Sequence, residues 1–108
     1  MREIKFRAWN DMKKRMEHDV YKEYENLMQY TGLKDKNGVD IYEGDILKIE
    51  GAYFRKTIRE NMVVEYDESR AWFGVLDVLH TVSLNNFDCE DDVEVIGNIY
   101  ENPELLEG

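Results

Sequence analysis

The sequence predicts one mainly β domain spanning residues 1–108. Three observations lead to this prediction. Short segments alternate apolar and polar side chains with the period of two that is typical of strands. Glycine, asparagine and aspartate separate these segments, as they do at tight turns. The 108 residues include one proline, no internal repeat and no low-complexity linker, so nothing indicates a boundary between two domains.

The first strand is predicted at IKFRAW, residues 4–9, where apolar positions alternate with Lys5, Arg7 and Trp9. One face of this strand should pack, and the other is basic and aromatic. After a polar turn, MKKRME at residues 12–17 is expected to return as the second strand of a hairpin, although its residues form helices equally well.

The later strands follow the same alternation. A buried strand is expected at 46–49, and segments 62–66 and 71–78 should form a second hairpin across a polar turn at 67–70. The last strand is expected at 93–100. The inward positions of these strands predict a common core formed by Leu47, Ile49, Val64, Phe73, Val95 and Ile99.

Two turns and one helix start are marked by their residue types. Asn37 and Gly38 are the pair that tight hairpins favour, because both tolerate positive φ. Gly44 marks a bend before a buried strand, and Asp45 is expected to secure that bend by accepting hydrogen bonds from nearby backbone amides. Pro103 suits the first position of a short C-terminal helical turn, where no N–H is needed.

Two acidic groups raise the question of catalysis or metal binding. Asp40, Glu43 and Asp45 could supply paired carboxylates for acid–base chemistry, but the turn role of Asp45 is favoured. The run DCEDDVE, residues 88–94, lacks the ligand spacing of a calcium loop and is typical of a solvated acidic loop. We therefore expect no metal site and no cofactor.

The remaining reactive residue types are isolated. His18, His80 and Cys89 show no spacing that would build a zinc site or a nucleophile with its base. The sequence also lacks a phosphate-binding loop, a dinucleotide fingerprint and a nucleophile elbow. We expect no catalytic residues, and we expect that the protein is not an enzyme.

Charge and cysteine content limit the partners and the compartment. The 24 acidic and 14 basic side chains give a formal charge of −10, which disfavours generic binding to nucleic acid. The single cysteine cannot form an intramolecular disulfide. We expect no export and no membrane span, because MREIKFRAW lacks the apolar segment of a signal peptide and no apolar run approaches the length of a membrane helix. These features predict a cytoplasmic protein with no membrane association.

Basic residues interleaved with aromatic ones form the candidate interaction surface. Such interleaving can bind phosphates and stack bases, but it can equally be a solvated basic face on an acidic protein. The residues of this candidate surface are Lys5, Arg7, Trp9, Lys13, Lys14, Arg15, Tyr53, Arg55, Lys56 and Arg59.

Four blocks of the sequence resemble one known family. FRAW (6–9), MQYTGLKDKNG (28–38), IYEGDIL (41–47) and VIGNIYENPELL (95–106) are similar to the YopX family of phage and prophage proteins. The resemblance implies a small SH3-like barrel with additional N-terminal and C-terminal strands and a short C-terminal helical turn. It also implies an oligomer, and it implies no chemistry.

We therefore expect a non-enzymatic phage or prophage accessory protein that associates with host or phage proteins or with copies of itself. A nucleic-acid-associated module that uses the basic clusters, and an acidic decoy of a DNA-binding host factor, are the alternatives. A homo-oligomer is expected, with the strand that carries Phe6 and Trp9 as its interface. The competing outcome is a monomer in which Trp9 is buried within its own domain.

Overall fold

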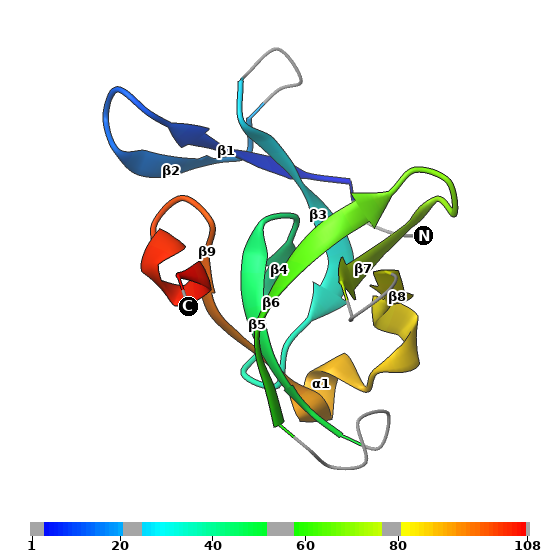
Figure 1. Ribbon diagram of the computed structural model, residues 1–108. Helices are drawn as coiled ribbons and strands as arrows, with labels where there is room; N and C mark the ends of the chain where they lie inside the picture. The colour runs from blue at the N-terminus through cyan, green and yellow to red at the C-terminus, as the bar shows by residue number, and fades with distance from the viewer. Residues whose placement is uncertain (1–3, 21–24, 52–57, 77–80, 108) are drawn as a thin grey trace.

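The structure is a computed structural model that describes residues 4–20, 25–51, 58–76 and 81–107. These residues form nine strands, one short α-helix and two 3-10 helices (Figure 1). The elements are β1 (Phe6–Asn10), β2 (Arg15–His18), β3 (Leu27–Lys34), β4 (Asp40–Tyr42), β5 (Asp45–Glu50), β6 (Ile58–Asp67), β7 (Trp72–Leu76), β8 (Thr81–Ser83), η2 (Leu84–Asn86), α1 (Cys89–Asp92), β9 (Val93–Asn98) and η3 (Pro103–Leu106).

The strands form two antiparallel sheets. A four-stranded sheet has the order β2-β1-β3-β4, and a five-stranded sheet has the order β8-β7-β6-β5-β9. The five-stranded sheet curls into a half-barrel (Figure 1). The β1–β2 hairpin extends away from this half-barrel (Figure 1). The mainly β, barrel-like fold with additional N-terminal strands and a short C-terminal turn is thus confirmed.

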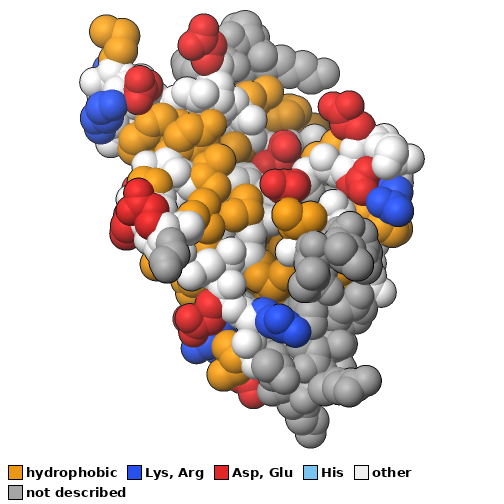
Figure 2. All heavy atoms as spheres, viewed as in Figure 1, with side chains coloured by type: hydrophobic (Ala, Val, Ile, Leu, Met, Phe, Trp, Pro, Cys, Tyr) orange, Lys and Arg blue, Asp and Glu red, His pale blue; other side chains and the backbone are white. Residues whose placement is uncertain are grey.

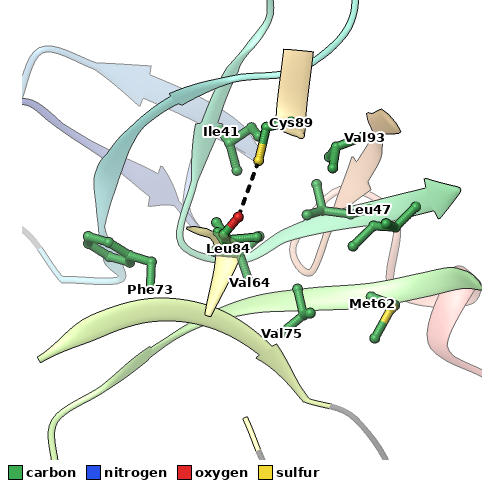
Figure 3. Close-up of a cluster of buried hydrophobic side chains, with 10 residues drawn as sticks. Ile41, Leu47, Met62, Val64, Phe73, Val75, Leu84, Cys89 and Val93 are labelled. Atoms are coloured by element: carbon green, nitrogen blue, oxygen red, sulfur yellow. Dashed lines mark hydrogen bonds between the residues drawn. The ribbon is translucent and has the colours of Figure 1, made fainter. Parts of the chain in front are cut away.

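The core is formed by residues of β5, β6, β7 and β9 together with residues of β4, η2 and α1. Four of the predicted core residues belong to it, while Val95 is partly buried and packs against it. Ile99 is half-buried outside this cluster, because β9 ends at Asn98 and the chain turns there. Figure 3 shows the buried cluster, which comprises Ile41, Leu47, Ile49, Met62, Val64, Phe73, Val75, Leu84, Cys89 and Val93.

The predicted hairpins are present. β1 pairs with β2 across a turn at residues 11–14, and β6 pairs with β7 across a turn at 68–71, one residue later than the predicted 67–70. Asp67 Oδ1 closes the second turn by accepting hydrogen bonds from the backbone amides of Ser69 (3.0 Å) and Arg70 (3.2 Å). Pro103 begins η3, as its position in the sequence predicts.

The turn between β3 and β4 depends on a residue that the sequence did not single out. Gly38 has a φ of +79°, whereas Asn37 is not among the residues with positive φ, so only one residue of the pair uses the left-handed region. The buried Asp35 holds this turn: its Oδ1 accepts from the amides of Asn37 (2.8 Å) and Val39 (2.9 Å). Its Oδ2 accepts from the amide of Val95 (2.9 Å) and so attaches the turn to β9.

Gly44 turns the chain between β4 and β5. Its φ of +81° lies in the region that disfavours side chains, as the sequence predicted. Its N–H donates to the Val64 carbonyl (2.9 Å), and its carbonyl accepts from the Ile99 amide (2.9 Å), so the bend is fixed to β6 and to the end of β9. A Cβ added here would lie 3.0 Å from the sulfur of Met28.

We expect Gly44→Ala to lower the free energy of unfolding by about 1–3 kcal/mol, because it combines backbone strain with the contact to Met28. Gly38→Ala is the matched control: its φ is +79° and nothing lies within 4 Å of the added Cβ. It should cost only the strain, about 1 kcal/mol. Urea unfolding of both variants measures the difference, and equal losses would show that the Met28 contact contributes nothing.

Candidate interaction surfaces

Arg7 is buried, so the prediction that it belongs to an outward interaction surface is wrong. Its side chain is 8% exposed and its Nη2 donates to Asp45 Oδ1 over 2.6 Å. The guanidinium carbon lies 4.5 Å from the centre of the Tyr42 ring. Burial does not alternate along β1 as expected, because Arg7 and Ala8 are both buried while Ile4 is 70% exposed. The Arg7 side chain turns inward onto the corner between β4 and β5.

Asp45 performs the turn role that the sequence favoured. Its Oδ2 accepts from the Tyr42 amide over 2.8 Å while its Oδ1 accepts from Arg7. Burial raises the pKa of Asp45, and the nearby Arg7 guanidinium and the Tyr42 amide oppose that rise. Arg7 Nε is buried without a hydrogen-bond partner among the described residues. The pair is therefore costly to bury and acts in positioning the strands.

The other carboxylates considered for acid–base chemistry have separate partners. Asp40 binds Lys5 Nζ at 2.6 Å and also pairs with Lys34. Burial raises the pKa of Asp40, but the hydrogen bonds from the two lysines outweigh burial and leave it below its usual value. Glu43 Oε1 accepts from the Gln29 amide over 2.9 Å. Each carboxylate is thus accounted for by a structural contact.

Lys5 and Trp9 also pack against their own chain. Lys5 Nζ lies 4.5 Å from the centre of the Tyr30 ring in addition to its contact with Asp40. The Trp9 ring is half-buried and stacks on Tyr100, with ring centres 5.8 Å apart and planes 10° apart. The aromatic face predicted for β1 is therefore largely used within the molecule.

The basic cluster at the tip of the β1–β2 hairpin is exposed and locally neutralised. Lys14 pairs with Asp11 at 2.9 Å, and Arg15 pairs with Glu17 at 3.1 Å. Lys13 is exposed on the same turn. This arrangement brings acidic side chains into the predicted basic cluster and weakens its attraction for a phosphate backbone.

The second basic cluster is described only in part. Arg59 is exposed on β6. Tyr53, Arg55 and Lys56 lie outside the described residues.

The two histidines are not brought together by the described structure. His80 lies outside the described residues, whereas His18 is exposed. The centre of the His18 ring lies 6.3 Å from the centre of the Tyr42 ring, with the two ring planes 74° apart.

Cys89 is a core residue. It begins α1, is 7% exposed, and its thiol donates to the Leu84 carbonyl over 3.7 Å (Figure 3). Burial, followed by the negative charges of Asp88, Asp92 and Glu90, raises the pKa of Cys89 to about 11. Within the described ranges, no group of three or more histidine, cysteine, aspartate or glutamate residues is placed to hold a metal ion.

One cleft was not anticipated from the sequence. It has a volume of ≈ 380 Å³ and lies between the second half of β3 and the start of β7. The sequence marks this cleft weakly, because Gly32 and Asn85 are the only lining residues whose types favour turns or unusual backbone conformations. Its lining consists of Thr31, Gly32, Leu33, Ala71, Trp72, Phe73, Leu84 and Asn85.

Comparison with known proteins identifies the family. The family model described as YopX protein matches residues 12–107, nearly the whole chain. The chain belongs to the YopX protein family. No curated protein matches it significantly. None of the helices in the described ranges has the length and apolar character needed to cross a bilayer.

A solved structure supports the fold of this YopX-family chain. Protein EF1440 from Enterococcus faecalis is similar to it, with a TM-score of 0.62 and 29% sequence identity. The similarity covers 98% of this chain and 99% of that one. The two proteins therefore share the fold over their full matched length.

A double-mutant cycle tests the role of the buried ion pair. We expect Arg7→Met and Asp45→Asn each to lower the free energy of unfolding by about 3–5 kcal/mol, because each leaves one polar partner uncompensated. The double variant should lose much less than the sum, since both charges are gone and an Asn oxygen can still accept from the Tyr42 amide. Urea unfolding measures the cycle, and additive losses would contradict coupling.

Cys89 should resist alkylation in the folded protein. With a pKa of about 11, the thiol is almost entirely protonated at neutral pH, and its burial blocks access as well. We expect iodoacetamide to modify Cys89 about a hundredfold more slowly in buffer than in urea. Mass spectrometry over a time course measures both rates, and equal rates would mean that the thiol is accessible in the native fold.

Proposed function

We propose that this protein is a non-enzymatic phage or prophage accessory protein that acts in the host cytoplasm by associating with other protein chains, including copies of itself. The observation that carries this proposal is the open edge of the β1–β2 hairpin. β2 is the outer strand of the four-stranded sheet, and β1 lies inside it between β2 and β3. We therefore place the proposed self-association interface on β2 and not on β1.

The hydrogen-bonding pattern indicates which groups of β2 face outward. The Lys5 carbonyl accepts from Tyr30, and the Trp9 amide donates to Asn26, so the odd positions of β1 bond toward β3. The even positions of β1 therefore bond toward β2, where their partners are Glu17 and Arg15. The backbone groups of the intervening Met16 then point away from β1, toward the open edge.

An open edge can take up another strand, because its unpaired N–H and C=O groups repeat the pattern of a sheet. The exposed tip of the hairpin adds apolar surface, since Met12 is 96% exposed. Figure 2 shows hydrophobic side chains on one face of the molecule with acidic side chains around them. Such a surface suits contact with protein better than contact with phosphate.

The two alternative functions have less support. A nucleic-acid module would use the two basic clusters, but in the first of them Lys14 and Arg15 pair with acidic side chains on the same hairpin. An acidic decoy rests on the net charge of −10 and on the exposed carboxylates near α1. Neither alternative uses the open edge of β2.

Light scattering across about a hundredfold range of protein concentration tests self-association. We expect the mean mass to rise with concentration, and we expect Met16→Pro to shift the protein toward monomer, because proline removes an outward N–H from the edge. Glu17→Pro is the matched control, since residue 17 bonds toward β1 and its loss should instead unfold the hairpin, seen by circular dichroism.

A constant monomer mass would eliminate self-association. An oligomer that is unchanged by a folded Met16→Pro variant would remove the β2 edge from its interface. Binding of duplex DNA that weakens steeply with salt would favour the nucleic-acid alternative.

A further inference from the structure

The cleft between β3 and β7 has an unusual wall on the β3 side. β3 pairs with β4 at Tyr30 and again at Lys34, but the partners Tyr42 and Asp40 are only two residues apart. Residues 31–33 of β3 therefore lie opposite the single residue Ile41 of β4, and the two extra residues form a bulge in the ladder. The cleft is bordered here by main chain as well as by side chains.

The Thr31 hydroxyl holds this bulge in place. It donates to the Ile41 carbonyl over 2.7 Å and accepts from the Leu33 amide over 3.2 Å. Gly32, between them, has a φ of +89° and presents only main chain to the cleft. The bulge is thus a fixed feature with its own hydrogen bonds, and it leaves room beside β3.

The opposite wall contains an unpaired donor. Trp72 lines the cleft, and its buried indole N–H has no hydrogen-bond partner within the described part of the chain. The preceding residue, Ala71, has a φ of +56°, which is costly for a residue with a side chain. A buried donor without an acceptor also destabilises the free protein. Two unfavourable features therefore meet on this wall.

We propose that this cleft binds an extended peptide segment of a partner protein, with an apolar side chain against Leu33, Phe73 and Leu84 and a backbone carbonyl that accepts from the Trp72 indole. Lysine or arginine on either side of the apolar residue would match the net charge of −10. The inference rests on the proposed role in protein association, and it names a surface separate from the β2 edge.

An extended peptide fits these walls better than a compact ligand does. The lining includes strand segments on both sides, residues 31–33 of β3 and residues 72–73 of β7. A peptide in this conformation offers a carbonyl at every residue and points alternate side chains to opposite sides. Its backbone can therefore accept from the Trp72 indole while one of its apolar side chains contacts Leu33, Phe73 and Leu84.

Binding includes a small rearrangement of the rim, because the indole N–H is covered in the free protein. Arg70 is the exposed side chain that can move. Its guanidinium lies 5.7 Å from the centre of the Trp72 ring, and its other contact is a pair with Asp67 at the surface. Side-chain changes of this size are common when proteins bind partners.

The test uses the full chain and the probe acetyl-Lys-Val-Leu-Val-Lys-amide, titrated while the indole signals of Trp9 and Trp72 are followed by ¹H–¹⁵N NMR. Trp9→Phe assigns the two signals and is the control for losing a tryptophan. We expect the Trp72 signal alone to move with the probe. Acetyl-Lys-Ser-Gly-Ser-Lys-amide has the same charge and no apolar residue, and it should not bind.

Two variants locate the binding site. Trp72→Phe removes the donor and should weaken the probe by about tenfold, the effect of one buried hydrogen bond. Asn85→Tyr fills the cleft from an exposed position, and should weaken the probe by at least about tenfold without unfolding the chain. Its matched control is Asn86→Tyr, because Asn86 is also exposed but does not line the cleft.

The proposal is overturned if the Trp72 signal stays fixed up to millimolar probe, or if Asn85→Tyr and Asn86→Tyr bind the probe equally well. If the serine-containing probe binds as tightly as the apolar probe, charge alone explains the binding, and the proposal is overturned as well. These readouts do not depend on the oligomeric state. Loss of self-association alone would therefore contradict the proposed β2 contact and leave the peptide site standing.

Discussion

The ion pair between Arg7 and Asp45 is the contact on which the arrangement of the two sheets depends. Arg7 belongs to β1 in the four-stranded sheet, and Asp45 begins β5 in the five-stranded sheet. The same carboxylate also accepts from the Tyr42 amide at the corner between the sheets. Each member of this buried pair needs an oppositely charged partner in the right orientation, and few packings of the two sheets provide one. The pair therefore favours a single arrangement of the sheets, although its burial is costly.

Much of the fold could be predicted from local residue types. Gly44 has the positive φ that its position indicated, Asp67 closes a polar turn, and Pro103 starts the last helical turn. These features depend on a few neighbouring residues, which the sequence displays directly. The fate of Arg7 could not be read this way, because alternation separates two faces of a strand but does not say which face the rest of the chain will cover.

The cleft was beyond sequence reasoning for a related reason. Its two walls come from segments about 40 residues apart. The positive φ of Ala71 could not be predicted either, because alanine rarely adopts positive φ and so does not indicate it in a sequence. The tip of the first hairpin shows a similar effect, since Lys14 and Arg15 form a basic run in the sequence but meet Asp11 and Glu17 in space. Long-range pairing decides both cases.

Asp35 has a consequence for the order of events during synthesis. Its carboxylate holds the β3–β4 turn and also receives the amide of Val95, which lies 60 positions later. β9 further pairs with β5, so both sheets depend on a strand that is synthesised after every other strand of the two sheets. Completion of the five-stranded sheet must therefore await the synthesis of β9, and until then the edge of β5 that β9 will cover is open to other strands.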